Sequence, residues 1–161
     1  MLIKAYTIIA DRVEDDLYIY GEGPLEKELN SLIATTAVAH RIHLMGRTND
    51  VIKVLEKSKV FALSSNFEGM PNALLEAVCM LVPSVSTDCP CGGPREICNN
   101  GCGLLSPIED VKAFANNLYK AVSDIQLREH LSEKCMERRI AFSNEIILEQ
   151  WDTFFEKVCS N

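Results

Sequence analysis

Residues 59–87 read KVFALSSNFEGMPNALLEAVCMLVPSVST and alternate between two kinds of local pattern. The runs 59–63 and 84–87 are short and carry β-branched and aromatic residues, which predicts strands. Between them, 64–71 is a polar loop with glycine and proline, and 72–81 has the apolar spacing of a helix. A strand, a helix and a second strand in this order predict a parallel unit with a right-handed crossover.

The same alternation continues on both sides of that unit. Strands separated by helices predict an α/β domain with a Rossmann-like parallel sheet flanked by helices. Apolar runs predict strands that are buried on both faces. The other expected strands are 16–20, 41–45 and 103–106, and the other expected helices are 2–11, 25–37, 50–57, 95–98, 109–123, 125–140 and 143–158.

The first expected element is a helix, whereas a doubly wound domain usually opens with a strand and a ligand-binding loop. We therefore expect the first strand of the fold to be missing. A length of 161 residues predicts one domain over 1–161, with the helix at about 143–158 as a C-terminal extension.

Composition excludes several classes of function. A net charge of −7 argues against a nucleic-acid partner, which needs a basic face. The seven cysteines have no zinc-type spacing and are expected to be reduced thiols that pack as small hydrophobes, and no metal is expected. No stretch approaches the roughly 20 apolar residues of a membrane span, and no signal peptide is recognisable, which predicts a cytoplasmic protein.

Four loops are expected at the carboxyl ends of the strands, where open α/β sheets bind ligands. They are 21–24, 46–50, 64–72 and 88–94, and all four contain glycine. Glycine lets the backbone approach a ligand closely, so these loops are candidates for a binding site.

The loop 64–72 holds the strongest candidates. Glu68 lies in this loop, and Glu76 lies about one turn inside the following helix. The start of that helix would offer free amides to an anion such as a diphosphate, Glu76 could accept hydrogen bonds from a ribose, and Glu68 could meet the next sugar. Both glutamates also fit the ordinary roles of solvated helix residues, and spacing alone leaves the two interpretations open.

Two further loops carry weaker candidates. Arg47 follows a glycine that ends a strand and could stack on a planar base, although an isolated arginine is more often solvated. Residues 92–96, GGPRE, have the chemistry of a helix start, for which a plain turn is a better interpretation than a functional role.

Several segments together resemble glycosyltransferase family 4, whose members have the GT-B fold. The signature of that family is two glutamates separated by seven residues, here Glu68 and Glu76. The surrounding sequence is similar to that of the bacterial family members that build surface polysaccharides and lipopolysaccharide. The segments are LYIYGEGPLEKEL at 17–29, IHLMGRTNDV at 42–51, SSNFEGMPNALLEAVCMLVPSVSTDCPCGGPREI at 64–97 and GLLSPIED at 103–110.

This resemblance implies the C-terminal, donor-binding half of a GT-B enzyme and a role for each matching residue. Glu68 would be the catalytic residue that faces the donor sugar near its reacting carbon, and Glu76 would bind the ribose. The reaction would be retaining transfer from a nucleoside-diphosphate sugar, expected to be a UDP-sugar, to a polysaccharide or lipid-linked acceptor, without metal or cofactor. The other donor-binding residues would be Gly69, Met70, Pro71, Asn72 and Ala73 for the sugar and diphosphate, Gly21, Arg47 and Thr48 for the base and distal phosphate, and Gly92, Gly93 and Glu96 at the pocket edge.

The sequence also departs from the family pattern. Family members carry an arginine and a lysine that bind the diphosphate, and these two residues come before the first matching segment. Family members also have an N-terminal acceptor-binding domain, which would associate peripherally with the inner face of the membrane. We expect residues 1–161 alone to be inactive without these parts. The alternatives are a non-catalytic nucleotide-sugar-binding module that pairs with a separate acceptor domain, and a GT-B epimerase. Val82 stands where the family usually has glycine.

Overall fold

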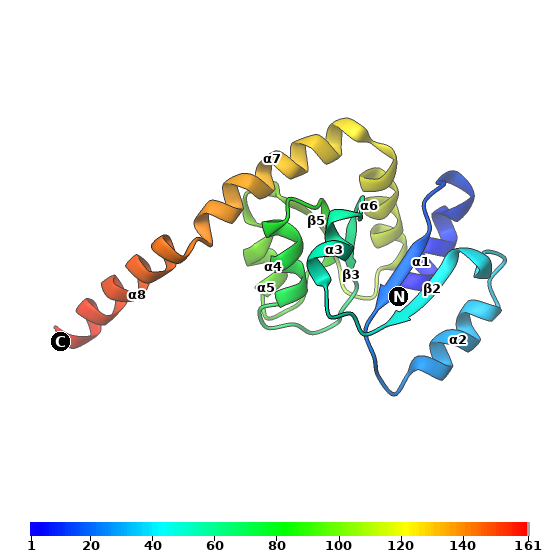
Figure 1. The fold of residues 1–161 in the computed structure, drawn as a ribbon, viewed down its shortest axis with the longest axis horizontal. Coiled ribbons are helices and arrows are strands. Elements are labelled where there is room, and N and C mark those ends of the chain that lie inside the picture. The colour runs from blue at the N-terminus through cyan, green and yellow to red at the C-terminus, as the bar shows by residue number, and fades with distance from the viewer. Residues whose placement is uncertain (161) are drawn as a thin grey trace.

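A computed structural model describes residues 1–160, and its helices and strands alternate as predicted (Figure 1). The strands 84–87 and 103–106 have the predicted bounds, whereas the strand expected at 59–63 is shorter. The helices are α1 (Leu2–Ile9), α2 (Glu26–Ala34), α3 (Val51–Glu56), α4 (Asn72–Cys79), α5 (Gly93–Ile97), α6 (Val111–Ser123), α7 (Ile125–Ala141) and α8 (Asn144–Cys159). The strands are β1 (Leu17–Tyr20), β2 (Ile42–Gly46), β3 (Phe61–Leu63), β4 (Ser84–Thr87) and β5 (Gly103–Ser106).

The strands form two parallel sheets. β1 pairs with β2 in one sheet, and the other sheet has the order β3-β4-β5. Helices cover both faces of the second sheet, because α1 and α6 contribute to one apolar cluster with β4, and α4, α5 and α7 to another with β3 and β5. The predicted α/β architecture with parallel strands is therefore confirmed.

Helix α1 packs on both sheets. Ala5 and Ile9 belong to the cluster that contains Val85 of β4. Tyr6, less than one turn away from each of them, belongs to the cluster that contains Ile42 of β2. One helix therefore contributes side chains to the apolar clusters of both sheets.

The prediction that every strand is buried on both faces is correct for β4 and wrong for β1. All four residues of β4 are buried. In β1 the burial alternates, and Tyr18 and Tyr20 are 53% and 40% exposed. The physical reason is one-sided packing, because Leu17 and Ile19 contact the cluster of α1 and α2, whereas Tyr18 stacks on His43 at 4.7 Å between ring centroids.

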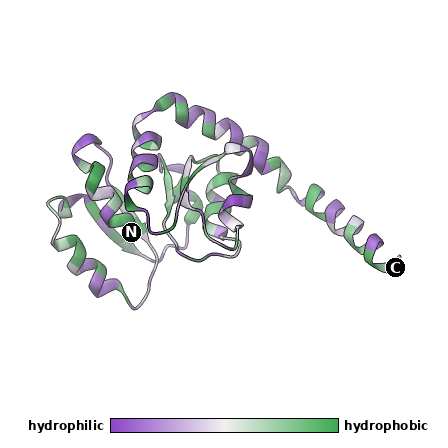
Figure 2. Cartoon of the chain, turned by 180° about the vertical axis from the view of Figure 1, so that it is seen from behind, coloured by the Kyte–Doolittle hydropathy of each residue, from purple (hydrophilic) through white to green (hydrophobic). Residues whose placement is uncertain are grey.

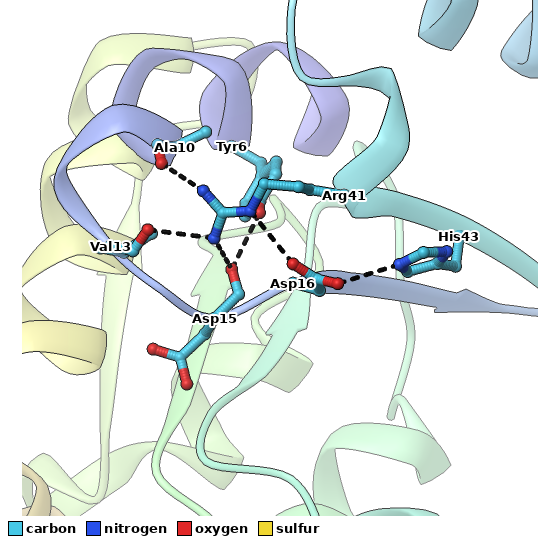
Figure 3. Close-up of polar contacts among 7 residues, drawn as sticks. All are labelled: Tyr6, Ala10, Val13, Asp15, Asp16, Arg41 and His43. Carbon is cyan, nitrogen blue, oxygen red and sulfur yellow. Dashed lines mark hydrogen bonds and ion pairs between the residues drawn. The ribbon is translucent and has the colours of Figure 1, made fainter.

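Arg41, just before β2, fixes the segment that leads into β1 (Figure 3). Its guanidinium donates hydrogen bonds to the backbone oxygens of Ala10, Val13 and Asp15. It also donates to Asp16 Oδ1 at 3.1 Å, and His43 Nε2 lies 3.1 Å from Asp16 Oδ2. This network satisfies backbone oxygens of the turn, and the oxygen of Asp15 also accepts from the Tyr6 hydroxyl at 2.8 Å.

The C-terminal helices differ in how they pack. α7 lies against α4, and its Ser132 hydroxyl donates to the backbone oxygen of Leu81 at 2.9 Å. α8 extends away from the rest of the chain, with hydrophobic residues along its length (Figures 1 and 2). None of its residues is buried, and Trp151 is 53% exposed.

All seven cysteines are free thiols. Cys89, Cys98, Cys102 and Cys135 are buried, and the last three lie in the cluster formed with α4 and α7. Their packing agrees with the prediction that these thiols serve as small apolar side chains.

Candidate functional site

The loops that follow β1 and β2 meet at the carboxyl ends of these strands. The amide of Gly21 donates to the backbone oxygen of Gly46 at 2.8 Å. Gly46 has a φ of +66°, a conformation that side chains other than glycine rarely adopt. A cavity of about 340 Å³ opens here, lined by Tyr20, Gly21, Pro24, Leu44 and Gly46 among others. Gly21, which the sequence predicts to bind the donor, therefore lines this cavity.

The predicted residues Arg47 and Thr48 lie in the loop after β2. The side chain of Arg47 is exposed. The Thr48 hydroxyl oxygen accepts a hydrogen bond from the Asp50 amide at 3.1 Å, and Asp50 in turn caps α3 through the Lys53 amide at 3.2 Å. Neither Arg47 nor Thr48 is among the residues that line the cavity. In this structure Thr48 supports the cap of α3.

The loop 64–71 after β3 holds Glu68 in place. Ser65 Oγ donates to Glu68 Oε1 at 2.7 Å. The backbone oxygen of Ser65 accepts from the hydroxyl of Thr87 and from the thiol of Cys89, the latter at 3.3 Å. A buried strand end thus fixes the residue that orients the Glu68 carboxylate. By contrast, Phe67 on the same loop is 73% exposed.

Ser65, Thr87 and Cys89 were not among the residues expected at the site. Ser65 and Glu68 are three residues apart in one loop, so their contact is local in the sequence. The contacts from Thr87 and Cys89 join residues more than 20 positions apart, at the end of β4, and no local pattern predicts them.

The start of α4 is open to solvent. Pro71 precedes the helix and is buried, and its backbone oxygen accepts from the amides of Leu74 and Leu75, both at 3.1 Å. Asn72 and Ala73 are the first two residues of the helix, and their amides have no acceptor within it. Both residues are exposed at the surface of the domain.

The rest of α4 anchors that helix start. Leu74, Ala77 and Val78 are buried against the core, whereas Glu76 is exposed one turn inside the helix. The first turn contains no acidic residue that would satisfy the helix dipole. An anion at the start of α4 would therefore meet positive potential without a competing carboxylate in that turn.

The loop after β4 lies directly against loop 64–71. Gly93, the first residue of α5, has its α-carbon so close to Gly69 that a β-carbon would lie 1.5 Å from the Gly69 backbone oxygen. Met70, between Gly69 and the helix start, is 50% exposed. Gly92 precedes α5 with a φ of +81°. The predicted residues of these two loops are therefore brought together in one cluster.

Charged groups around α5 are paired within the fold. Arg95 forms an ion pair with Asp88 Oδ2, and the other oxygen of Asp88 is buried without a hydrogen-bond partner among the described residues. Glu96, predicted at the pocket edge, pairs with Arg138 of α7. The structure therefore gives Glu96 a contact to α7.

The described residues contain no group of three or more histidine, cysteine, aspartate or glutamate side chains arranged to hold a metal ion. The chemistry available at the site is hydrogen-bond donation from backbone amides and acceptance by two carboxylates, those of Glu68 and Glu76. Donors of the first kind suit a phosphate group, and carboxylates suit sugar hydroxyls.

Comparison with known proteins identifies the family. Residues 1–124 match the family model of glycosyl transferases group 1. The chain belongs to this family. It is 28% identical to an uncharacterized glycosyltransferase of Methanocaldococcus jannaschii, over 96% of this chain and 45% of the relative.

A second glycosyl transferase relative has a defined acceptor in its name. The chain is 30% identical to a 4-alpha-N-acetylgalactosaminyltransferase of Campylobacter jejuni, named for the acceptor N-acetylgalactosamine-N,N'-diacetylbacillosaminyl-diphospho-undecaprenol, over 88% of this chain and 38% of the relative. The chain thus spans less than half the length of these two relatives.

Solved glycosyl transferase structures confirm the fold. A variant of S. aureus TarM in complex with Fondaparinux, alpha-GlcNAc-glycerol and UDP superposes with a TM-score of 0.84 at 27% identity, covering 96% of this chain and 32% of that one. The neighbours are GT-B glycosyltransferases, so this glycosyl transferase domain has the Rossmann-like α/β architecture of that fold. The family match ends at residue 124, before α7 begins.

Proposed function

We propose that this chain is the C-terminal, donor-binding half of a retaining family 4 glycosyltransferase, which transfers a sugar from a UDP-sugar to a polysaccharide or lipid-linked acceptor. The observation that carries the proposal is the exposed start of α4, which lies between Glu68 and Glu76 in the sequence. Membership of the glycosyl transferases group 1 family supports it, as do the UDP in the TarM complex and the lipid-linked acceptor of the Campylobacter relative.

In this proposal the diphosphate binds at the start of α4. The amides of Asn72 and Ala73 donate to its oxygens, and the helix dipole adds to the attraction. Hydrogen bonds to a charged group contribute about 1.5–3 kcal/mol each. The carboxylate of Glu76 then accepts hydrogen bonds from the two ribose hydroxyls, and the cavity beside Gly21 receives the distal part of the nucleotide.

Glu68 acts on the donor sugar. Transfer breaks the bond between the anomeric carbon and the diphosphate oxygen and forms a bond from that carbon to the acceptor hydroxyl oxygen, whose proton goes to the departing diphosphate. Positive charge develops on the sugar ring during this exchange. A carboxylate held near that carbon stabilises the charge, and the hydrogen bond from Ser65 fixes the carboxylate before the donor binds. The negative charge that builds on the departing diphosphate is stabilised by the same amides that bind it. No metal or cofactor is required in this scheme.

The acceptor half would be the partner of this chain. Because the chain spans less than half the length of the relatives, the whole enzyme's acceptor is proposed to bind to a second domain. That domain would carry the peripheral attachment to the inner face of the membrane. None of the helices in residues 1–160 is long and apolar enough to cross a bilayer. The length difference also favours a second candidate, a non-catalytic module that binds nucleotide sugars and pairs with a separate acceptor domain.

Calorimetric or NMR titration with UDP, GDP and ADP tests the proposal. UDP is expected to bind, and Glu76→Ala is expected to weaken its binding at least about tenfold, the effect of losing roughly 1.4 kcal/mol. The matched control is Glu149→Ala on the exposed helix α8, which should leave UDP affinity unchanged. If none of the three nucleotides binds at millimolar concentration, the proposed donor-binding function is wrong and only the fold assignment stands.

Assays of sugar transfer separate the two candidate functions. A transferase half is expected to gain activity when an acceptor domain is added, and to lose it in Glu68→Ala. A binding module would retain UDP affinity and never support transfer, whatever acceptor domain is supplied.

A further inference from the structure

We propose that the groove formed by α1, the end of α2 and the start of α6 binds a single-chain lipid phosphate. The hydrocarbon chain would lie in the apolar part of the groove, and the phosphate would lie between Lys4 and Lys112. This groove is called the α1–α6 groove below. Its apolar lining, the free ammonium groups at its rim and the charge of the helices around it support the proposal, which is independent of the proposed donor site.

Apolar side chains from three helices line the α1–α6 groove. Ile3 is only 3% exposed, whereas Ile8, one to two turns later in α1, is 50% exposed. Leu32 of α2 and Val111 of α6 complete the apolar lining. The volume of about 420 Å³ lies within the roughly 300–1,000 Å³ of sites that bind small molecules. A hydrocarbon chain in this groove would leave water and cover exposed apolar surface, which favours binding.

The polar groups of the groove divide into hydroxyls that are already bonded and ammonium groups that are free. The hydroxyls of Thr7 and Thr36 each donate at 2.8 Å to a backbone oxygen three or four residues earlier. Lys4 and Lys112 are exposed, and neither side chain forms an ion pair or a hydrogen bond with another residue in the range 1–160. The groove therefore offers two positive charges to a ligand.

The helices on the two sides of the groove are basic although the chain is acidic. α1 and α6 contain three lysines and no aspartate or glutamate, in a chain with a net charge of −7. The acidic residues of α2, Glu26 and Glu28, lie in its first turn, and Leu32, which lines the groove, comes one turn or more later. The groove is therefore locally positive, which attracts an anion and repels a cation of the same size.

The packing of α1 on α6 brings the two lysines to the same end of the groove. The two helices lie side by side. Lys4 and Lys112, both near the start of their helices, line the same groove, and Arg12, just after α1, lies 3.7 Å above the ring of Tyr119 near the end of α6. The helices therefore run in the same direction. The nearest acid in the sequence, Asp110, is engaged as the cap of α6, where its Oδ1 accepts from a backbone amide at 2.9 Å.

A phosphate monoester matches this pair of charges better than a carboxylate does. It carries about −1.5 to −2 charges at pH 7 and several strong acceptor oxygens, so one group can neutralise two lysines. Hydrogen bonds between lysine and phosphate are charge-assisted and therefore strong. Inorganic phosphate alone would leave the apolar lining in water, so the full groove selects a phosphate that is attached to a hydrocarbon chain.

NMR titration of the ¹⁵N-labelled chain with decyl phosphate, kept below the concentration at which it forms micelles, tests the inference. Decyl phosphate is expected to bind one to one and to shift the amide signals of α1 and of the start of α6. The control ligands are inorganic phosphate, which lacks the chain, and decyltrimethylammonium, which has the same chain and the opposite charge. Both should bind at least about tenfold more weakly.

Variants of the two lysines test the assigned position of the phosphate. Lys4→Gln combined with Lys112→Gln should weaken binding of decyl phosphate at least about tenfold. The matched control is Lys57→Gln, an exposed lysine that does not line the groove, which should leave the affinity unchanged. Ile8→Glu adds a carboxylate at the rim and should also weaken binding, and the half-exposed position allows the substitution without unfolding.

Four results would overturn the inference. The first is equal binding of decyl phosphate and decyltrimethylammonium, and the second is inorganic phosphate binding as tightly as decyl phosphate. The third is unchanged affinity in the double lysine variant. The fourth is a shift of the same signals with chain concentration alone, because a second copy would then cover the groove. UDP affinity should stay the same in all these variants, so failure of the groove and failure of the donor site are distinguishable.

Discussion

The α-carbon of Gly93 touches the backbone oxygen of Gly69, so closely that a methyl group on Gly93 would lie 1.5 Å from that oxygen. This contact joins the first residue of α5 to the loop that carries Glu68. Because the obstacle is backbone and not the end of a flexible side chain, one of the two loops must move if residue 93 gains a side chain.

Gly93→Ala is therefore expected to destabilise the chain and to displace loop 64–71. Overpacking of this kind costs about 1–3 kcal/mol. Urea unfolding measures the loss in free energy, and UDP titration measures the effect on the start of α4, where affinity should also fall.

Gly23→Ala is the matched control, because a β-carbon there meets nothing within 4 Å. It should change the free energy of unfolding by less than about 0.5 kcal/mol. Equal effects of the two substitutions would mean that the contact between Gly69 and Gly93 does not position the loop.

A second prediction concerns the hydrogen bond from Ser65 to Glu68. Ser65→Ala removes the donor that orients the carboxylate, so binding of a UDP-sugar should weaken about 2- to 10-fold, as expected for a hydrogen bond of about 0.5–1.5 kcal/mol. Affinity for UDP should stay the same, because UDP has no donor sugar to meet Glu68. Calorimetric titration with both ligands measures the difference.

Two controls accompany that variant. Ser65→Thr keeps the hydroxyl and should restore affinity for the UDP-sugar. Ser64→Ala removes the neighbouring hydroxyl and should leave both affinities unchanged. A parallel loss of UDP and UDP-sugar affinity in Ser65→Ala would contradict the orienting role and indicate a general disturbance of the loop.

The secondary structure was predictable because each element has a local signal. The strand 84–87 lies between a proline and a Gly/Pro-rich loop, and the helices carry apolar residues at regular spacing. The burial of β1 was not predictable in the same way. Tyr18 and Tyr20 are residues typical of strands, but whether their face is covered depends on which helices pack there, and that is settled by contacts distant in sequence.

The candidate site likewise has a part that the sequence predicts and a part that it does not. Glu68, Glu76 and the start of α4 lie within one local stretch, and their arrangement follows from a loop and a helix. The support that Thr87 and Cys89 give to Ser65 depends on two parallel strands lying side by side. A contact of that kind has no spacing in the sequence that would reveal it.

The ion pairs of Asp16 predict a pH dependence of stability. Hydrogen bonds from His43 and then from Arg41 hold the pKa of Asp16 below its ordinary value. A carboxylate whose pKa is lower in the folded state contributes stability above its unfolded pKa of about 3.9 and loses it as pH falls through the folded value. The chain should therefore lose this contribution as the solution is acidified below about pH 4.

Asp16→Asn isolates that contribution. The difference in free energy of unfolding between the original chain and this variant should be largest near neutral pH and should shrink at acid pH. Asp11→Asn is the control, because Asp11 is exposed. Urea unfolding across the acid range measures both, and a difference for Asp16→Asn that stays constant with pH would contradict the lowered pKa.

Arg41→Lys should destabilise the chain although the charge is kept. The guanidinium donates to three backbone oxygens, including those of Val13 at 3.0 Å and Asp15 at 2.8 Å, and its side chain is only 17% exposed. A lysine ammonium is a point charge that cannot reproduce this planar fork, so the backbone oxygens of Ala10 and Val13 lose their hydrogen bonds from Arg41, at a cost of about 1–3 kcal/mol. Urea unfolding measures the loss, with Arg139→Lys at an exposed position as the control. If the two variants unfold at the same urea concentration, the segment before β1 does not depend on Arg41, and the ion pair between Lys59 and Asp15 would have to hold it instead.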